Sequence, residues 1–209
     1  MLSCAYCALH ACYTNEQDKI PKECISKDTK LIDKSLELYK GLDKKIAYNS
    51  ALVESEGYRT KTRIEEIIDF ANKCNFKKIG IAFCLSLSNE TKIVNKIFVH
   101  NKFEVYSAMC KMGGTPKETL GITDEQKVHP GGHEAMCNPI GQALYCNSKK
   151  TDFNVLIGLC VGHDSLFIKH SDAPVTVLIV KDRVLANNPT AAIYTANSYY
   201  KEKLFPKYD

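Results

Sequence analysis

Ten cysteines are the residues of this sequence most able to do chemistry, and three of them end strand-like segments. The segments cover residues 78–83, 103–109 and 153–159, and the cysteines that follow are Cys84, Cys110 and Cys160. The carboxyl ends of parallel strands meet at one edge of an open sheet, where ligands bind. We therefore expect a sulfur-rich site at that edge, which either holds a metal ion or supplies a reactive thiol.

Two further residues fit this predicted edge site. Cys137 precedes Asn138-Pro139, a pair typical of a helix start, and a helix amino terminus favours the thiolate form of cysteine. His163 lies three residues after Cys160, so the two side chains can face one point of a tight turn. We expect Cys160 as the nucleophile, with His163 as its base or co-ligand. Taken singly, a cysteine after a strand is more often a small buried hydrophobic residue.

Other residues have more ordinary interpretations. Cys74 and Cys146 fall at or within helices, and both are predicted to be thiols of the hydrophobic core. Asp182 and Arg183 follow the fourth strand and fall on the side of the predicted edge site. Asp182 could act as an acid or base there, although a salt bridge within the loop is the simpler expectation.

A second cysteine cluster lies at the amino terminus. Its members are Cys4, Cys7, Cys12 and Cys24. Two cysteines separated by two residues can bind one tetrahedral ion, and two more can close the shell. A closed four-sulfur shell is structural, because no position stays open for a substrate. We predict zinc here, with an iron–sulfur cluster second, because the spacing matches neither common ferredoxin motif. His10 could replace Cys12.

Composition narrows the class of protein. The 209 residues contain no apolar run long enough to cross a bilayer, and the amino terminus lacks a secretory pattern, so we expect a cytoplasmic protein without a membrane partner. Cysteines in a reducing compartment are more often metal ligands or catalytic groups than disulfides. Only three of the 28 basic residues are arginine, and the net charge is +4, so nucleic-acid binding is not expected. A small molecule is the expected ligand, and the oligomeric state stays open.

The hydrophobic pattern predicts the elements that must position these residues. The segment at residues 78–83 has little polar alternation, which is typical of a strand covered on both faces. With strands at 103–109, 153–159 and 174–180 and helices between them, the sequence predicts an α/β fold. The expected architecture is a three-layer domain whose mostly parallel sheet has about four strands.

Domain limits and helices follow from the same pattern. Residues 1–27 are predicted as a cysteine-rich metal-binding extension, and residues 28–209 as the α/β domain with helices at its start. One helix is expected from Asp28 to about Val53, weakened at Gly41. A final helix is expected from residue 188 to about residue 200. The intervening residues 111–136 are predicted to be a long loop, which usually has a functional reason or is mobile.

Several segments resemble a known family. They are residues 62–84, Cys137-Asn138-Pro139-Ile140 and residues 158–189, of which the string Cys160-Val161-Gly162-His163-Asp164 is the most specific. They are similar to an uncharacterised family of predicted metal-binding proteins, a domain of unknown function from archaea and anaerobic bacteria. The resemblance implies metal binding, first at the amino-terminal cysteines, and supplies no activity or substrate. Its extension to the strand-end cysteines rests on their predicted position.

Three functions are compatible with these residues. The first is a metal- or thiol-dependent enzyme that acts on an unknown small molecule at the carboxyl edge of the sheet. The second is a non-catalytic binding or regulatory module stapled by zinc. The third is an iron–sulfur redox protein. Whether the chain catalyses any turnover is left open by the sequence.

Overall fold

The computed structural model describes residues 4–207. Met1–Ser3, on which the expectation about export partly rests, lie outside the described residues. The chain forms two compact units, residues 1–56 and residues 57–209. The predicted boundary after residue 27 concerns a smaller segment and stays a prediction.

The first unit consists of three short 3-10 turns followed by two helices. The turns are η1 (Cys4–Tyr6), η2 (Gln17–Lys19) and η3 (Ile25–Lys27), and the helices are α1 (Thr29–Glu37) and α2 (Gly41–Gly57). Asp28 caps α1, because its carboxylate accepts a hydrogen bond of 3.1 Å from the backbone N–H of Leu31. Gly41 has a φ of +52°. The weakness predicted at Gly41 is therefore a break between two helices.

The second unit is built on a four-stranded, all-parallel sheet, which confirms the predicted α/β fold. Its strands are β1 (Lys78–Phe83), β2 (Glu104–Met109), β3 (Phe153–Ile157) and β4 (Val175–Ile179). The strand order is β2-β1-β3-β4, and every neighbouring pair is parallel. β1 and β3 are the two central strands, and helices cover both of their faces, which explains their apolar sequences.

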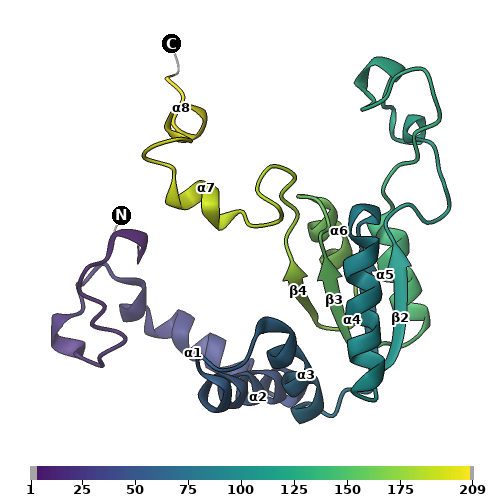
Figure 1. Ribbon diagram of the computed structural model, residues 1–209. Helices are drawn as coiled ribbons and strands as arrows, with labels where there is room; N and C mark the ends of the chain where they lie inside the picture. Colours follow the sequence, from purple (N-terminus) through teal and green to yellow (C-terminus); the bar gives the residue numbers. More distant parts are fainter. Residues whose placement is uncertain (1–3, 208–209) are drawn as a thin grey trace. The chain divides into compact units, whose positions relative to one another are not determined.

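Helices pack against both faces of the sheet. One hydrophobic cluster joins α3 (Arg63–Lys73) and α4 (Ser88–His100) to one face. A second cluster joins α5 (Pro139–Ser148) and α6 (His163–His170) to the other face. Along the chain β1 leads to α4, and its neighbour β3 leads to α6. The helices α4 and α6 lie on opposite faces of the sheet (Figure 1). Ligands of open α/β sheets bind where neighbouring connections diverge in this way.

The loop at residues 111–136 has a small structure of its own. It contains the 3-10 turns η5 (Lys117–Leu120) and η6 (Asp124–Gln126), and an antiparallel bridge between Pro116 and Ala135 closes its base. The buried ammonium of Lys127 donates to the Asp124 carboxylate and to the carbonyl of Gly132, each at 2.9 Å. The loop is therefore held by internal polar contacts.

The carboxyl-terminal helix is shorter than predicted. The segment expected as one helix from residue 188 to about residue 200 forms only α7 (Thr190–Tyr194), and a further short helix, α8 (Lys201–Leu204), follows. Thr195 ends α7 with its hydroxyl bonded to the carbonyl of Ala191, a local contact that competes with helix continuation. None of the helices within residues 4–207 combines the length and apolar character needed to cross a membrane.

Candidate active site at the carboxyl edge of the sheet

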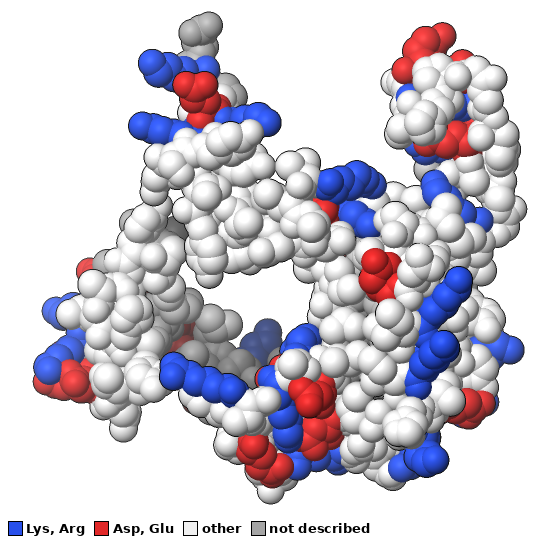
Figure 2. Space-filling model, in the orientation of Figure 1, with Lys and Arg blue, Asp and Glu red and all other residues white. Residues whose placement is uncertain are grey.

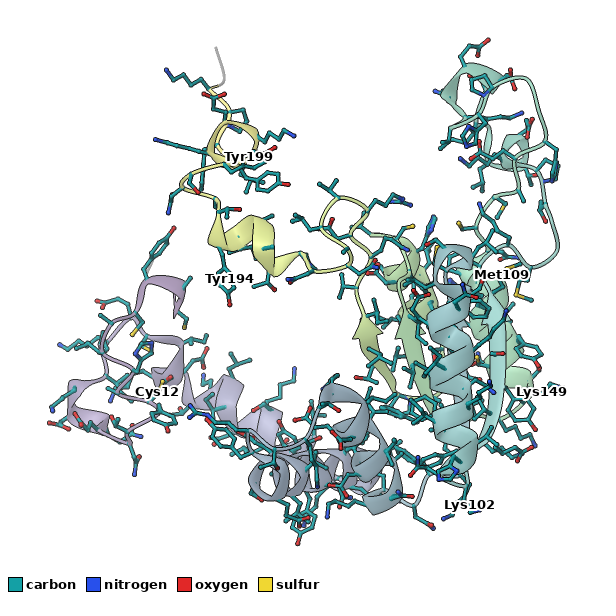
Figure 3. All side chains as sticks on the ribbon, in the orientation of Figure 1. Cys12, Lys102, Met109, Lys149, Tyr194 and Tyr199 are labelled. Atoms are coloured by element: carbon teal, nitrogen blue, oxygen red, sulfur yellow. The ribbon has the colours of Figure 1, made fainter. Side chains whose placement is uncertain are left out.

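The ladder of the sheet brings two of the predicted thiols together. Phe83 and Met109, the last residues of β1 and β2, are in register, and Figure 3 shows Met109 at the carboxyl end of β2. The ladder continues one residue further, because the N–H of Cys110 donates to the carbonyl of Phe83 at 2.9 Å. The N–H of Cys84 likewise donates to the carbonyl of Ile157 at 3.0 Å. Cys84 and Cys110 therefore occupy equivalent positions on neighbouring parallel strands.

A third thiol reaches the same place from the start of α5. The N–H of Asn138 donates to the carbonyl of Cys110 at 2.7 Å, which holds the adjacent Cys137 against the end of β2. The Asn138 side chain caps α5 by accepting from the N–H of Gly141 at 2.8 Å. One turn later, the Gln142 amide donates to strand carbonyls at the ends of both β1 and β2. Side chains of α5 thus bind the ends of two strands together.

These three residues form what we call the three-thiol cluster: Cys84, Cys110 and Cys137. The side chain of Cys110 lies within hydrogen-bonding reach of both other thiols, and its single S–H can donate to one of them at a time. Its Sγ also accepts from the N–H of Leu85 at 3.4 Å. Cys110 is only 3% exposed, whereas Cys84 and Cys137 are half-buried. The cluster is therefore one buried thiol between two accessible thiols.

The contacts within the cluster lower the pKa values of two of its thiols and raise the pKa of the third. The hydrogen bond from Cys110 lowers the pKa of the Cys84 thiol well below the ordinary value, with Ser86 and the charge of Lys181 adding to the effect. The alternative hydrogen bond, from Cys110 to Cys137, lowers the pKa of Cys137, helped by the charges of Lys111 and His163. The same two bonds, together with burial, raise the pKa of Cys110. Cys110 therefore keeps its proton and donates it to a neighbouring thiolate.

Basic side chains approach the cluster from β4. The Lys181 ammonium donates to the Ser86 hydroxyl at 2.7 Å, and that hydroxyl lies 3.4 Å from the sulfur of Cys84. The Arg183 guanidinium donates to the sulfur of Cys160 at 2.9 Å. Figure 2 shows basic side chains gathered over this edge of the sheet. The Asp182 carboxylate instead caps its own loop, accepting backbone N–H groups at 2.9 and 2.8 Å.

Cys160 and His163, which were predicted to act together, interact with different residues. The N–H of His163 donates to the carbonyl of Cys160 at 2.9 Å, so a tight turn does join the two residues at the start of α6. The charge of His163, however, acts on Cys137, and the sulfur of Cys160 accepts from Arg183. The assignment of Cys160 as nucleophile stays a prediction.

Sequence reasoning missed four residues that shape the site: Lys111, Gln142, Ser86 and Lys181. Two of these four residues could have been predicted from the same reasoning that located the cysteines, because Lys111 and Lys181 also follow the ends of parallel strands. No pattern in the sequence indicates Gln142, whose role depends on the packing of α5 against the ends of two strands.

The amino-terminal cysteines lie in the first unit. The N–H of Cys7 donates to the carbonyl of Cys4 at 3.2 Å, which forms a turn, and Figure 3 shows Cys12 on this segment. Cys4 and Cys12 are exposed, and Cys7 and Cys24 are half-buried. Within residues 4–207, no group of three or more histidine, cysteine, aspartate or glutamate side chains is arranged to hold a metal ion. Binding of zinc or of an iron–sulfur cluster at the amino-terminal cysteines therefore stays a prediction. The alternative in which the strand-end cysteines hold a metal ion is likewise not supported by the described side chains.

Comparisons with known proteins cover most of the chain. A family model described as "Protein of unknown function (DUF1847)" matches residues 24–178. A protein of Methanocaldococcus jannaschii, named as the uncharacterized protein MJ0455, is 48% identical over 204 residues, which are 97% of this chain and 98% of the relative. No solved structure matches significantly. The family segment includes the three-thiol cluster but begins after Cys12.

Proposed function

The chain belongs to the DUF1847 family of proteins of unknown function, and from the geometry of its site we propose that it is a thiol-dependent enzyme acting on a small molecule. One arrangement carries the proposal: at the carboxyl edge of the sheet, the Cys110 side chain at the end of β2 lies within hydrogen-bonding reach of Cys84, at the end of β1, and of Cys137, before α5. That is where the fold class binds its ligands. Clusters of groups with strongly displaced pKa values are characteristic of functional sites.

Within this proposal, Cys84 is the nucleophile. Its thiol is accessible, and it receives the hydrogen bond of the buried Cys110. Ser86 can donate its hydroxyl proton to the Cys84 thiolate, because Lys181 occupies the acceptor side of that hydroxyl. The sequence favoured Cys160 for this role, but the surroundings of Cys84 support a thiolate more directly.

The arrangement suits covalent catalysis. A thiolate at Cys84 can attack an electrophilic carbon or sulfur atom and form a covalent intermediate. Lys181 and Arg183 lie beside two of the edge cysteines, where their charges can stabilise negative charge that develops on the substrate. His163 is available beside Cys137 to move protons.

Alkylation kinetics test this proposal. Each cysteine would be labelled with iodoacetamide between pH 6 and pH 9 and quantified by peptide mass spectrometry. A thiol with a lowered pKa keeps its thiolate fraction as the pH falls, whereas an ordinary thiol, with a pKa of about 8.5, loses about tenfold per pH unit. We expect Cys84 to react fastest and to remain reactive at pH 6. Cys146, whose pKa burial raises to about 11, is the internal reference.

A pair of lysine variants sharpens the test. Lys181→Met removes the charge beside Ser86, so the pH midpoint for alkylation of Cys84 should rise. Lys169→Met removes the same charge from an exposed position on α6 and should leave the midpoint unchanged. If Cys84 in the folded protein reacts no faster than Cys146, or if both variants shift the midpoint equally, the proposed nucleophile is wrong.

A separate proposal, untested by the fold, is zinc at the amino-terminal cysteines, with an iron–sulfur cluster second. Four soft thiolate ligands support it. So does the lack of a hydrophobic core, because Ala11 and Ile20 are the buried hydrophobic residues among residues 4–27. The arrangement of the described side chains does not support it. If zinc binding were the chain's main property, the protein would be a non-catalytic binding or regulatory module.

A further inference from the structure

The three-thiol cluster contains one thiol that a substrate cannot reach. Cys110 is 3% exposed, while Cys84 and Cys137 on either side of it are half-buried. A nucleophile needs access to its substrate, so Cys110 is not placed to attack a molecule that arrives from solvent. It is placed to attack a sulfur atom of its own neighbours. In thiol–disulfide chemistry this is the position of a resolving thiol, which displaces a group first captured by another cysteine.

The backbone of Cys84 and Cys110 has the spacing that a disulfide needs. The two residues follow an in-register pair on neighbouring parallel strands. Neighbouring strands lie about 4.8 Å apart, and the Cα atoms of disulfides are usually about 4.4–6.8 Å apart. The N–H of Leu85 bonds to the sulfur of Cys110 at 3.4 Å, so that sulfur already faces the end of β1. The bond can form without a large movement of the backbone.

We propose that Cys84 and Cys110 form a reversible disulfide, so that the edge site is a two-electron redox couple whose substrates are low-molecular-weight disulfides. This inference rests on the proposed function, because Cys84 must first act as a nucleophile. It adds the substrate class and gives the buried thiol a part in the chemistry.

The reaction has two exchange steps. The Cys84 thiolate attacks one sulfur of the substrate RSSR, the S–S bond breaks, and RS⁻ leaves, which gives a mixed disulfide at Cys84. Cys110 then attacks the Cys84 sulfur while its proton passes to the Cys137 thiolate, and the second RS⁻ leaves. Each RS⁻ takes a proton from water. The substrate is reduced by two electrons to two RSH, and the Cys84–Cys110 pair is oxidised to a disulfide.

The experiment uses bis(2-hydroxyethyl) disulfide as the probe. The full-length protein, reduced and kept without oxygen, would be mixed with the probe, quenched with N-ethylmaleimide and mapped by peptide mass spectrometry. We expect a Cys84–Cys110 disulfide and release of two thiols per chain. Cys110→Ala should stop at the mixed disulfide on Cys84 and release one thiol. Ser107→Ala, a change at an exposed residue of β2, should behave like the wild type.

Mapping of the wild type decides the outcome even if Cys110→Ala fails to fold. Absence of a closed bond, or closure between any other pair of cysteines, would overturn the proposed couple. The alkylation kinetics separate this failure from a failure of the proposed function. A reactive Cys84 that never closes a disulfide leaves the nucleophile intact and removes only the redox couple. An unreactive Cys84 removes both.

Discussion

At the scale of single residues, identical cysteine side chains acquire opposite properties from their surroundings. Cys146 lies fully buried against apolar side chains of the second hydrophobic cluster, and burial raises its pKa to about 11. Cys84 receives hydrogen bonds from Cys110 and Ser86, and its pKa is lowered. The expectation that Cys74 and Cys146 are core thiols is confirmed by their complete burial. Residue type alone would not distinguish these thiols.

Gln142 provides a test at the same scale. Its amide donates to the carbonyl of Ala108 at 2.6 Å and to that of Phe83 at 3.2 Å, while its buried Oε1 has no hydrogen-bond partner within the described chain. Gln142→Ala removes both hydrogen bonds and opens a cavity, and both changes lower the free energy of unfolding. The substitution also removes a buried oxygen that has no partner, which offsets part of this loss. We expect the free energy of unfolding to fall by about 2 kcal/mol, as measured by urea denaturation.

Two other variants control that measurement. Gln142→Leu fills most of the volume and removes the unpaired oxygen, so it should cost clearly less than Gln142→Ala. Leu144→Ala changes an exposed residue of the same helix and should stay within about 0.5 kcal/mol of the wild type. An alanine variant at position 142 that is as stable as Leu144→Ala would show that the two carbonyl contacts contribute nothing.

At the scale of elements, strands were easier to predict than the ends of helices. The segment predicted at residues 78–83 is β1 without a shift, because a buried strand has a continuous apolar sequence bounded by polar residues. The predicted helix at residues 188–200 is mostly turns. No side chain of residues 188–200 is buried, so no packing extends the helix beyond its weak local propensity.

Two glycines in the loop between β3 and α6 give a matched test of how that loop is positioned. Gly158 has a φ of +64°, and a Cβ there would overlap Cδ1 of the buried Leu87. Gly162 has a φ of +82°, and a Cβ there would meet open space, with no packed side chain of the described residues within 4 Å. Alanine strains the backbone at both sites, by about 1–2 kcal/mol, but displaces a packed side chain only at Gly158.

We therefore expect Gly158→Ala to lower the free energy of unfolding by about 1–3 kcal/mol more than Gly162→Ala does. Urea denaturation of the two single variants measures the difference. Adding Leu87→Ala to Gly158→Ala should recover part of the excess, because the clashing methyl group is gone. Equal costs at the two glycines would mean that Leu87 yields freely and does not set the path of the loop.

At the scale of the whole molecule, the two units differ in how much core they contain. The second unit has two hydrophobic clusters on the faces of its sheet. The buried hydrophobic residues described in the first unit are Ala11, Ile20 and Val53. So small a core contributes little stability, and small units of this kind commonly depend on a metal or another crosslink.

Metal analysis of the whole chain follows from this difference. Protein purified without oxygen should contain one zinc ion per chain, and a variant with Cys4→Ser and Cys7→Ser should lose it. Cys160→Ser should retain it, because that residue lies in the second unit. A chelator should increase proteolysis within residues 4–27 and leave residues 57–207 resistant. Metal-free protein with unchanged resistance would refute the zinc prediction.

The sequence by itself determined the class of the fold and the positions of Cys84 and Cys110 directly after strands, because hydrophobic periodicity is local and parallel strands share one carboxyl edge. The strand predicted at residues 153–159 ends at Ile157, so Cys160 lies in the loop that follows β3. Only the tertiary structure decided which thiols lie in contact and which neighbouring groups lower their pKa values. The strand order places Cys84 beside Cys110, and Lys181 reaches Ser86 across 95 residues of sequence. The physical reason is range: hydrogen bonds and charge interactions act over a few ångströms of space, whatever the separation along the chain.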